Sequence, residues 1–209
     1  MKHIRLILWG LVAVALIGFI FTSLPQKTDN SANSQAVFKP MAGFEKGADF
    51  ALTTHTGDVF DTRKDIGQNG YALIFFGFAH CPVICPTELQ KFSDVMDMLP
   101  EHIANRVTPL FITIDPDRDT VETMQEYVSM FHPSIIGLTG NPQEVHKVLN
   151  NWKVYYSKVE DPSLNGYTMD HSTYSYLVDT NMNMLALFRM QATADDIAER
   201  IVQIAASNN

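Results

Sequence analysis

The chain has 209 residues, a formal net charge of −8 and two cysteines. This length suits one domain with a substantial core, and the acidic balance argues against nucleic acid as a partner. Two cysteines are too few for a disulfide scaffold, for a four-cysteine zinc site or for an iron–sulfur cluster. They leave open one disulfide, one redox-active pair or one small metal site.

An uncharged segment at residues 6–24 lies near the N-terminus, with Lys2 and Arg5 before it and an excess of acidic residues after it. A helix of this length would be about 28 Å long, close to the thickness of the hydrocarbon core of a membrane. The positive residues predict that the N-terminus stays in the cytoplasm and that the rest is exported. A cleaved signal peptide is the alternative, but the segment ends in Phe-Thr-Ser-Leu-Pro, a poor cleavage site.

We therefore expect a cytoplasmic N-terminus at 1–5, a transmembrane anchor at 6–24, a flexible tether at 25–37 and a folded domain at 38–209. Too few residues precede the anchor for a mitochondrial transit peptide, which favours a bacterial protein. This organisation predicts a single-pass protein of the bacterial inner membrane whose soluble domain lies in the periplasm.

The exported part alternates between strand and helix patterns. The apolar run at 71–78 (YALIFFGF) is typical of a strand buried on both faces. In chain order we predict a hairpin at 49–54 and 59–61, a strand at 71–78, a helix at 86–99, a strand at 107–114, a helix at 120–132, a strand at 135–138, a helix from Pro142 to about Trp152, strands at 152–159, 172–178 and 184–189, and a final helix capped by Thr193.

This order indicates an α/β fold, in which a mixed sheet is flanked by helices and extended by an N-terminal β-hairpin and an N-terminal transmembrane helix. A cysteine pair directly after the first central strand makes the plan thioredoxin-like.

Cys81 and Cys85 lie where the strand at 71–78 passes into the helix at 86–99. A helix N-terminus favours negative charge, so a thiolate there is stabilised and its pKa is lowered. A disulfide between them would close a small ring and stabilise the fold only modestly. The pair therefore suits a redox switch, or a metal site with at least one further ligand.

An imidazole is the natural third ligand, because two thiolates and one histidine nitrogen suit copper or zinc. His171 precedes a predicted strand and follows Asp170, an acid placed to orient the ring. The loops at one end of such a sheet converge on the same edge, which would bring His171 to the cysteines. His80 is the rival, although neighbouring residues on a strand point to opposite sides.

Four blocks of the sequence resemble the Sco/SenC family of copper-binding proteins that assist assembly of cytochrome c oxidase. They are residues 75–89 (FFGFAHCPVICPTEL), 111–120 (FITIDPDRDT), 137–145 (GLTGNPQEV) and 170–179 (DHSTYSYLVD). The likeness covers about residues 38–206. It implies a thioredoxin-like, copper-binding domain at 38–209, with a copper ion held by Cys81, Cys85 and His171. The implied partner is the oxidase subunit that bears the CuA centre, together with a copper-donating chaperone and a thiol reductant.

The same resemblance relates Asp115 to a family acid that affects metal loading or partner contact; a loop cap is an equally good interpretation. The family often has aspartate two residues after the first cysteine, where this chain has Val83. Two further segments are expected at the surface. These are a solvated loop with Asp117, Arg118 and Asp119, and an exposed turn with Met182 and Met184.

Two functions follow from these residues. The first is a copper chaperone that passes its ion to the oxidase by ligand exchange. The second is a thiol–disulfide reductase, in which Cys81 and Cys85 keep the target's cysteines reduced and His171 is dispensable. A peroxidase is disfavoured because neither cysteine lies in a Pro-x-x-x-Thr-x-x-Cys pattern.

Overall fold

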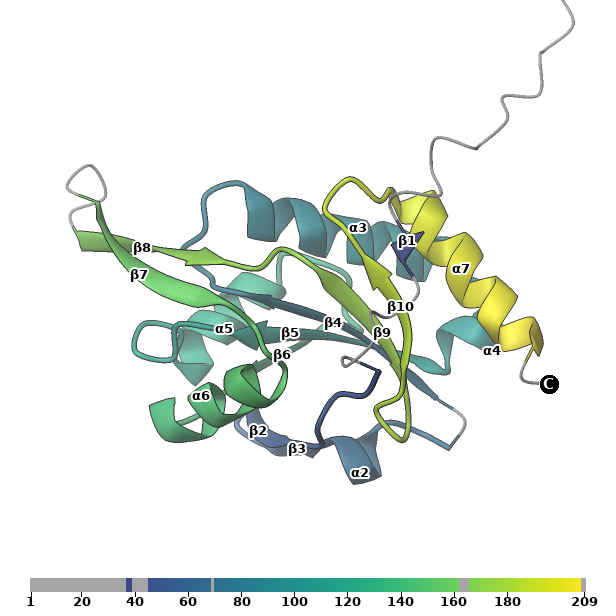
Figure 1. The fold of residues 1–209 in the computed structure, drawn as a ribbon, viewed down its shortest axis with the longest axis horizontal. Coiled ribbons are helices and arrows are strands. Elements are labelled where there is room, and N and C mark those ends of the chain that lie inside the picture. The colour runs from purple at the N-terminus through teal and green to yellow at the C-terminus, as the bar shows by residue number, and fades with distance from the viewer. Residues whose placement is uncertain (1–36, 39–44, 69, 162–165, 208–209) are drawn as a thin grey trace, which may run out of the picture. The chain divides into compact units, whose positions relative to one another are not determined.

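The computed structural model describes residues 37–38, 45–68, 70–161 and 166–207, all within one compact unit at 33–209 (Figure 1). Within these residues, eight strands form a mixed sheet in the order β1-β10-β9-β4-β5-β6-β2-β3, and β7 and β8 form a separate two-stranded sheet. The strands are β1 (Val37–Phe38), β2 (Ala51–Thr54), β3 (Val59–Asp61), β4 (Tyr71–Gly77), β5 (Val107–Thr113), β6 (Ile136–Thr139), β7 (Tyr156–Asp161), β8 (Gly166–His171), β9 (Ser175–Asp179) and β10 (Met184–Phe188).

The helices connect the strands and cover the sheet. They are α2 (Thr62–Asp65), α3 (Ile84–Met98), α4 (Glu101–Ala104), α5 (Val121–Val128), α6 (Pro142–Asn151) and α7 (Ala194–Ser207). Figure 1 shows α3 and α7 side by side, and these two helices pack against each other. The start of α7 has the predicted cap, since the Thr193 hydroxyl accepts from the Asp196 N–H at 3.2 Å and the Asp196 carboxylate accepts from the Thr193 N–H at 2.8 Å.

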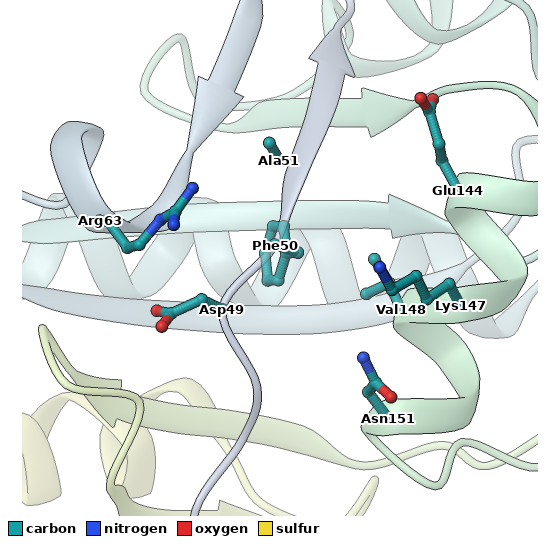
Figure 2. A pocket seen from close by; sticks show the side chains of 8 residues that line it. All are labelled: Asp49, Phe50, Ala51, Arg63, Glu144, Lys147, Val148 and Asn151. Carbon is teal, nitrogen blue, oxygen red and sulfur yellow. The ribbon is translucent and has the colours of Figure 1, made fainter.

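The N-terminal β-hairpin extends the sheet at one end. Its strands β2 and β3 pair with each other, and β2 continues the sheet against β6. A pocket of about 320 Å³ lies beside β2, between α2 and α6 (Figure 2). It contains Asp49 and Glu144 together with Arg63 and Lys147, so it favours neither sign of charge in a ligand.

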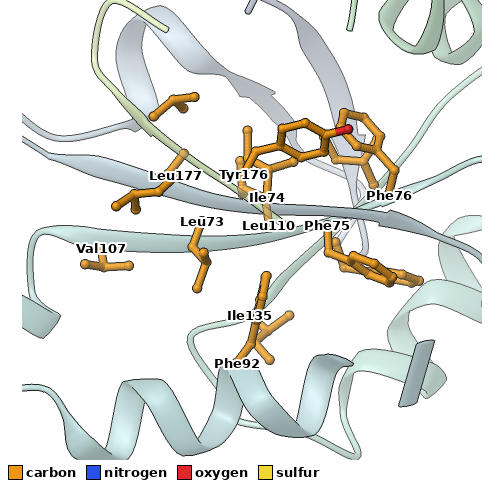
Figure 3. Close-up of a cluster of buried hydrophobic side chains, with 14 of the residues drawn as sticks. Leu73, Ile74, Phe75, Phe76, Phe92, Val107, Leu110, Ile135, Tyr176 and Leu177 are labelled. Carbon is orange, nitrogen blue, oxygen red and sulfur yellow. The ribbon is translucent and has the colours of Figure 1, made fainter. Parts of the chain in front are cut away.

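The centre of the sheet is the parallel pair β4–β5, in which Tyr71 lies opposite Val107 and Gly77 opposite Thr113. Every residue of β4 is buried, as its continuous apolar run predicts. Because side chains alternate along a strand, Leu73 and Phe75 face the side of α3, while their neighbours in β4 face the opposite side (Figure 3). On that opposite side, the Phe76 ring lies 5.7 Å from the rings of both Trp152 and Tyr176.

These observations confirm the predicted mixed sheet, its flanking helices and the N-terminal hairpin. Several boundaries differ: α3 begins at Ile84, two residues before the predicted start, and α5 ends at Val128. The largest error concerns β8, a strand that was not predicted because its short sequence, GYTMDH, has only two apolar residues, Tyr167 and Met169. Consequently His171 ends a strand and does not lie in a loop.

The predicted N-terminus at 1–5 and anchor at 6–24 lie outside the described residues, as does the tether at 25–37 except for Val37, which begins β1. Among the helices that the structure describes, none has the length and apolar character needed to cross a membrane.

Close packing at Gly47 yields a test of the fold. A Cβ atom at Gly47 would lie 2.4 Å from Cζ2 of Trp152, a fully buried ring whose Nε1 donates to the Ala48 carbonyl at 3.0 Å. We expect Gly47→Ala to lower the free energy of unfolding by about 1–3 kcal/mol, because the ring has no room to move. Urea denaturation followed by circular dichroism measures this.

Gly67→Ala is the matched control, because a Cβ atom there meets nothing within 4 Å. Its free energy of unfolding should stay within about 0.5 kcal/mol of the wild-type value. Equal stability of the two variants would contradict the packing described for Trp152.

Candidate functional site

The two cysteines lie at the junction of β4 and α3. Cys81 is in the connecting loop and half-buried, whereas Cys85 is the second residue of α3 and fully buried. Both are free thiols, and the Cys85 N–H donates a hydrogen bond to the Cys81 sulfur at 3.4 Å. Val83 occupies the N-cap position of α3 and gives no side-chain hydrogen bond, so the Cys81 sulfur accepts where a polar cap residue normally would.

The Cys85 sulfur packs against Gly77, which has no side chain. A Cβ atom at Gly77, the last residue of β4, would lie 2.7 Å from the Cys85 sulfur and 2.8 Å from the Phe111 ring. Only glycine at this position leaves room for both. The sulfur is therefore held against the end of the central strand.

The two thiols have opposite electrostatic environments. The pKa of Cys81 is lowered to about 5, chiefly because the Cys85 thiol donates a hydrogen bond to its sulfur, and secondly because backbone N–H groups of Cys85, Val83 and Ile84 do the same. Cys81 is therefore a thiolate at neutral pH. The same hydrogen bond raises the pKa of Cys85, and burial raises it further, so Cys85 keeps its proton.

His171 ends β8 with its ring beside the cysteine pair. Its Nε2 lies 3.9 Å from the Cys85 sulfur, and its Nδ1 lies 2.8 Å from the Ser172 carbonyl oxygen. Because a carbonyl can only accept, Nδ1 carries the proton and Nε2 presents a lone pair to the sulfur. Burial lowers the pKa of His171, which keeps the ring neutral. The orienting group is thus the Ser172 carbonyl, and the expectation that Asp170 would orient the ring was wrong.

Two aromatic rings pack against the imidazole. The ring centre of His171 lies 6.0 Å from that of Phe75 and 5.9 Å from that of Phe78, both edge to face. Among the described residues, no three His, Cys, Asp or Glu side chains already form a complete metal-binding group. The arrangement is a chain of contacts instead, from Cys81 to Cys85 and from Cys85 to His171.

The rival histidine points elsewhere. His80 Nδ1 lies 3.4 Å from Asp119 Oδ1, and about half of the His80 side chain is exposed. Its ring therefore faces the loop at 115–119. A pocket of about 300 Å³ opens beside the cysteine pair and gives it access to solvent. The pocket is lined by Phe78, Cys81, Pro82, Val83, Ile84, Thr168, Met169, Asp170, His171 and Thr173.

The loop at 115–119 is part of this site, and the expectation that Asp117, Arg118 and Asp119 form a solvated loop was wrong for Asp119, which is 0% exposed. The Asp119 carboxylate accepts the Ala79 N–H at 3.1 Å and the Thr113 hydroxyl at 2.6 Å. Asp115 is also buried and accepts the Tyr167 hydroxyl at 2.9 Å. The loop therefore touches both the cysteine loop and β8, and Tyr167 is a residue that the sequence analysis missed.

Met182, in the turn between β9 and β10, and Met184, the first residue of β10, are not at the surface. Met182 is 0% exposed and Met184 is buried, so the prediction of an exposed turn was wrong for both. The Asp179 carboxylate holds the turn by accepting the N–H groups of Asn181 and Asn183 at 2.8 and 2.9 Å. The two methionine side chains pack in the core.

Fold and site together define a thioredoxin-like α/β protein with a Cys-x-x-x-Cys pair at the start of a helix. Residues 39–206 match the SCO1/SenC family, and the chain belongs to this family. A SCO2-like protein of Rickettsia conorii is 39% identical over 173 residues, which cover 77% of this chain and 82% of the relative.

Two solved structures support the assignment. The crystal structure of Arabidopsis thaliana ScoI with copper bound has a TM-score of 0.68 and 35% identity, covering 78% of this chain and 99% of that one. The structure of Bradyrhizobium japonicum ScoI with copper bound also has a TM-score of 0.68, with 36% identity over 76% of this chain and 98% of that one. The predicted resemblance to the Sco/SenC family and the thioredoxin-like fold are thereby confirmed.

The opposite pKa shifts of the two thiols yield a test. At pH 6 in reductant, iodoacetamide should label Cys81 and leave Cys85 unmodified, because only the thiolate reacts. The labelling rate of Cys81 should reach half its maximum near pH 5. Mass spectrometry of peptides locates the label.

Cys85→Ala should move this midpoint up towards the ordinary thiol value of about 8.5, because the main stabilising hydrogen bond to the Cys81 sulfur is lost. Equal labelling of both cysteines in the wild type, with a midpoint near 8.5, would show that the sulfurs do not interact as described.

Proposed function

We propose that this chain binds copper through Cys81, Cys85 and His171 and delivers it during assembly of cytochrome c oxidase. The observation that carries the proposal is the His171 Nε2 lone pair, held 3.9 Å from the Cys85 sulfur by the hydrogen bond from Nδ1 to Ser172. The solved relatives with bound copper support the choice of ion.

The donor set fits the ion. Two thiolate sulfurs are soft ligands that favour copper(I), and a neutral imidazole nitrogen also binds copper well. Cys81 and His171 are already in their ligand forms, as a thiolate and a neutral ring. Cys85 must give up its thiol proton on binding, so uptake of the ion releases a proton.

The exposure of the ligands suggests an order for transfer. Cys81 is half-buried and lines the pocket, whereas Cys85 is fully buried. An incoming thiolate of the target reaches the ion on the Cys81 side, and ligand exchange proceeds from there. The expected target is the oxidase subunit with the CuA centre, with a copper-donating chaperone upstream.

We also propose an inner-membrane location with the copper site in the periplasm. The uncharged segment at 6–24, preceded by Lys2 and Arg5, supports an uncleaved anchor with its N-terminus in the cytoplasm.

Copper stoichiometry tests the ligand set. The reduced wild type should bind one copper(I) per chain, with two sulfurs and one nitrogen detected by X-ray absorption. His171→Ala should lower copper affinity by about 100-fold or more, because the nitrogen ligand is lost. The control is His102→Ala, which alters an exposed residue of α4 and should leave affinity unchanged. Undiminished affinity in His171→Ala would exclude this ligand set.

A thiol–disulfide reductase is the second candidate, favoured by the Cys81 thiolate at neutral pH. Cys81 would attack a target disulfide and form a mixed disulfide, releasing one target thiolate. Cys85 would then attack Cys81, release the second target thiolate, and leave an intramolecular disulfide. Two electrons pass to the target, and an external dithiol must reduce the pair again.

The same His171→Ala variant separates the two functions. A reductase should keep its rate of reducing a peptide disulfide in His171→Ala and lose it in Cys81→Ser, because the chemistry needs only sulfur. Reduction of the peptide is followed by chromatography. Loss of oxidase assembly in His171→Ala cells, with peptide reduction intact, would assign the biological role to copper and exclude the reductase.

A further inference from the structure

His171 lies at the end of β8, a strand that does not pair with any strand of the main sheet among the described residues. Within the described residues, β7 and β8 pair only with each other, whereas both cysteines follow β4 at the centre of the eight-stranded sheet. Contacts between side chains must therefore contribute to setting the distance between His171 and the thiols. Figure 1 shows this hairpin projecting past α5.

Two residues of the 115–119 loop, Arg118 and Asp115, hold β8 through Tyr167. Arg118 Nη1 donates to the Tyr167 carbonyl oxygen at 2.8 Å, and its guanidinium carbon lies 3.7 Å from the centre of the Tyr167 ring. The Tyr167 hydroxyl donates to Asp115 Oδ1 at 2.9 Å, while Arg118 Nε donates to the other oxygen of the same carboxylate. Backbone, ring and hydroxyl of Tyr167 are thus all held by Arg118 and Asp115.

This loop holds the cysteine side as well. The Asp119 N–H donates to the Asp115 carbonyl at 2.9 Å, which closes the loop into a turn. From that turn, the Asp119 carboxylate accepts the Ala79 N–H, two residues before Cys81. The loop is therefore a bridge, with β8 fixed at one end and the Cys-x-x-x-Cys loop at the other.

We propose that Arg118 and Tyr167 are positioning residues, which fix β8 so that His171 meets the Cys85 sulfur. Tyr167 and His171 are four residues apart on one face of β8, so they lie about 13 Å apart along the strand. Loss of the contacts at Tyr167 frees the strand that carries the imidazole but leaves both cysteines in place. The role of these residues in copper binding rests on the proposed function, whereas their effect on β8 does not.

The test compares Arg118→Gln and Tyr167→Phe with Lys158→Gln. Tyr167→Phe removes only the hydroxyl bond to Asp115, and it serves as the milder variant if Arg118→Gln fails to fold. Lys158 is the matched control because its Nζ lies 3.6 Å from the centre of the same ring but belongs to β7, outside the 115–119 loop.

Amide hydrogen exchange is measured first, on the protein without metal. We expect exchange of the amides of residues 167–171 to be about 10-fold faster in Arg118→Gln, and unchanged in Lys158→Gln, because only the former releases β8. Unchanged exchange in both Arg118→Gln and Tyr167→Phe would overturn the proposal. This measurement stands whether or not the wild type binds copper.

Copper affinity is measured second. We expect Arg118→Gln to weaken copper(I) binding by about 10-fold and to lose nitrogen ligation in X-ray absorption. Substitution of a residue that orients a metal ligand typically lowers metal affinity by this amount. The pH profile of Cys81 alkylation should stay as in the wild type. If the wild type binds copper without nitrogen ligation, the proposed ligand set fails and the exchange result alone decides the positioning role. Faster exchange with full copper affinity and intact nitrogen ligation would show that this contact does not position the ligand.

Discussion

The register of β4 against β5 is the constraint on which the site depends. Gly77 lies opposite Thr113 at the ends of the two strands, and the Ile114 N–H donates to the Gly77 carbonyl at 2.8 Å. The segments that follow β4 and β5 therefore leave the sheet side by side. One continues into the cysteine loop and the other into the 115–119 loop, where Asp119 accepts from Thr113 and from Ala79. A shift of one residue would move Gly77 away from the Cys85 sulfur and turn every buried side chain of β4 to the other face.

The charges of the two cysteines are set chiefly by the hydrogen bond between their sulfurs, and that of His171 is set by burial. Cys81 reaches solvent and is a thiolate, while the buried Cys85 keeps its proton and the buried His171 is neutral. The site without metal thus holds a single negative charge, shared through the hydrogen bond between the sulfurs. Binding of a monovalent ion with release of the Cys85 proton keeps the net charge at one negative unit. The buried site therefore carries no more net charge with the ion bound than without it, so binding adds no cost for burying further charge.

Much of the fold could be predicted from sequence because its central strands are continuous apolar runs and several of its helices, α5, α6 and α7 among them, have a capping residue. β4, β5 and the Thr193 cap are examples, and Pro109 is tolerated in β5 because pairing with β6 begins only at Leu110. The cysteine pair was also evident from its place after β4. β8 was not evident, because only Tyr167 and Met169 mark its partly buried face, which is too short an apolar pattern to indicate a strand.

The environment of the site was harder to predict than its residues. The sequence DPDRD has the composition of a surface loop, and only long-range contacts with Ala79 and Tyr167 show that Asp115 and Asp119 are buried. The contact of Nδ1 with the Ser172 carbonyl depends on the backbone path after β8, which local sequence does not specify. Met182 was wrongly predicted to be exposed for a similar reason. The other residues of its turn are all polar, yet the Met182 side chain is buried.

The valine at the start of α3 links the chemical state of one sulfur to the integrity of a helix. Val83 is 65% exposed and gives α3 no cap, so the first amides of the helix rely on the Cys81 sulfur as their acceptor. A thiolate accepts hydrogen bonds strongly, whereas a sulfur shared with a disulfide partner or with a metal ion has less charge to offer. We therefore expect oxidation or metal binding at Cys81 to weaken the hydrogen bonds at the first turn of α3. On this expectation, the exposed turn around Val83 would be better ordered when the site is empty than when it is filled.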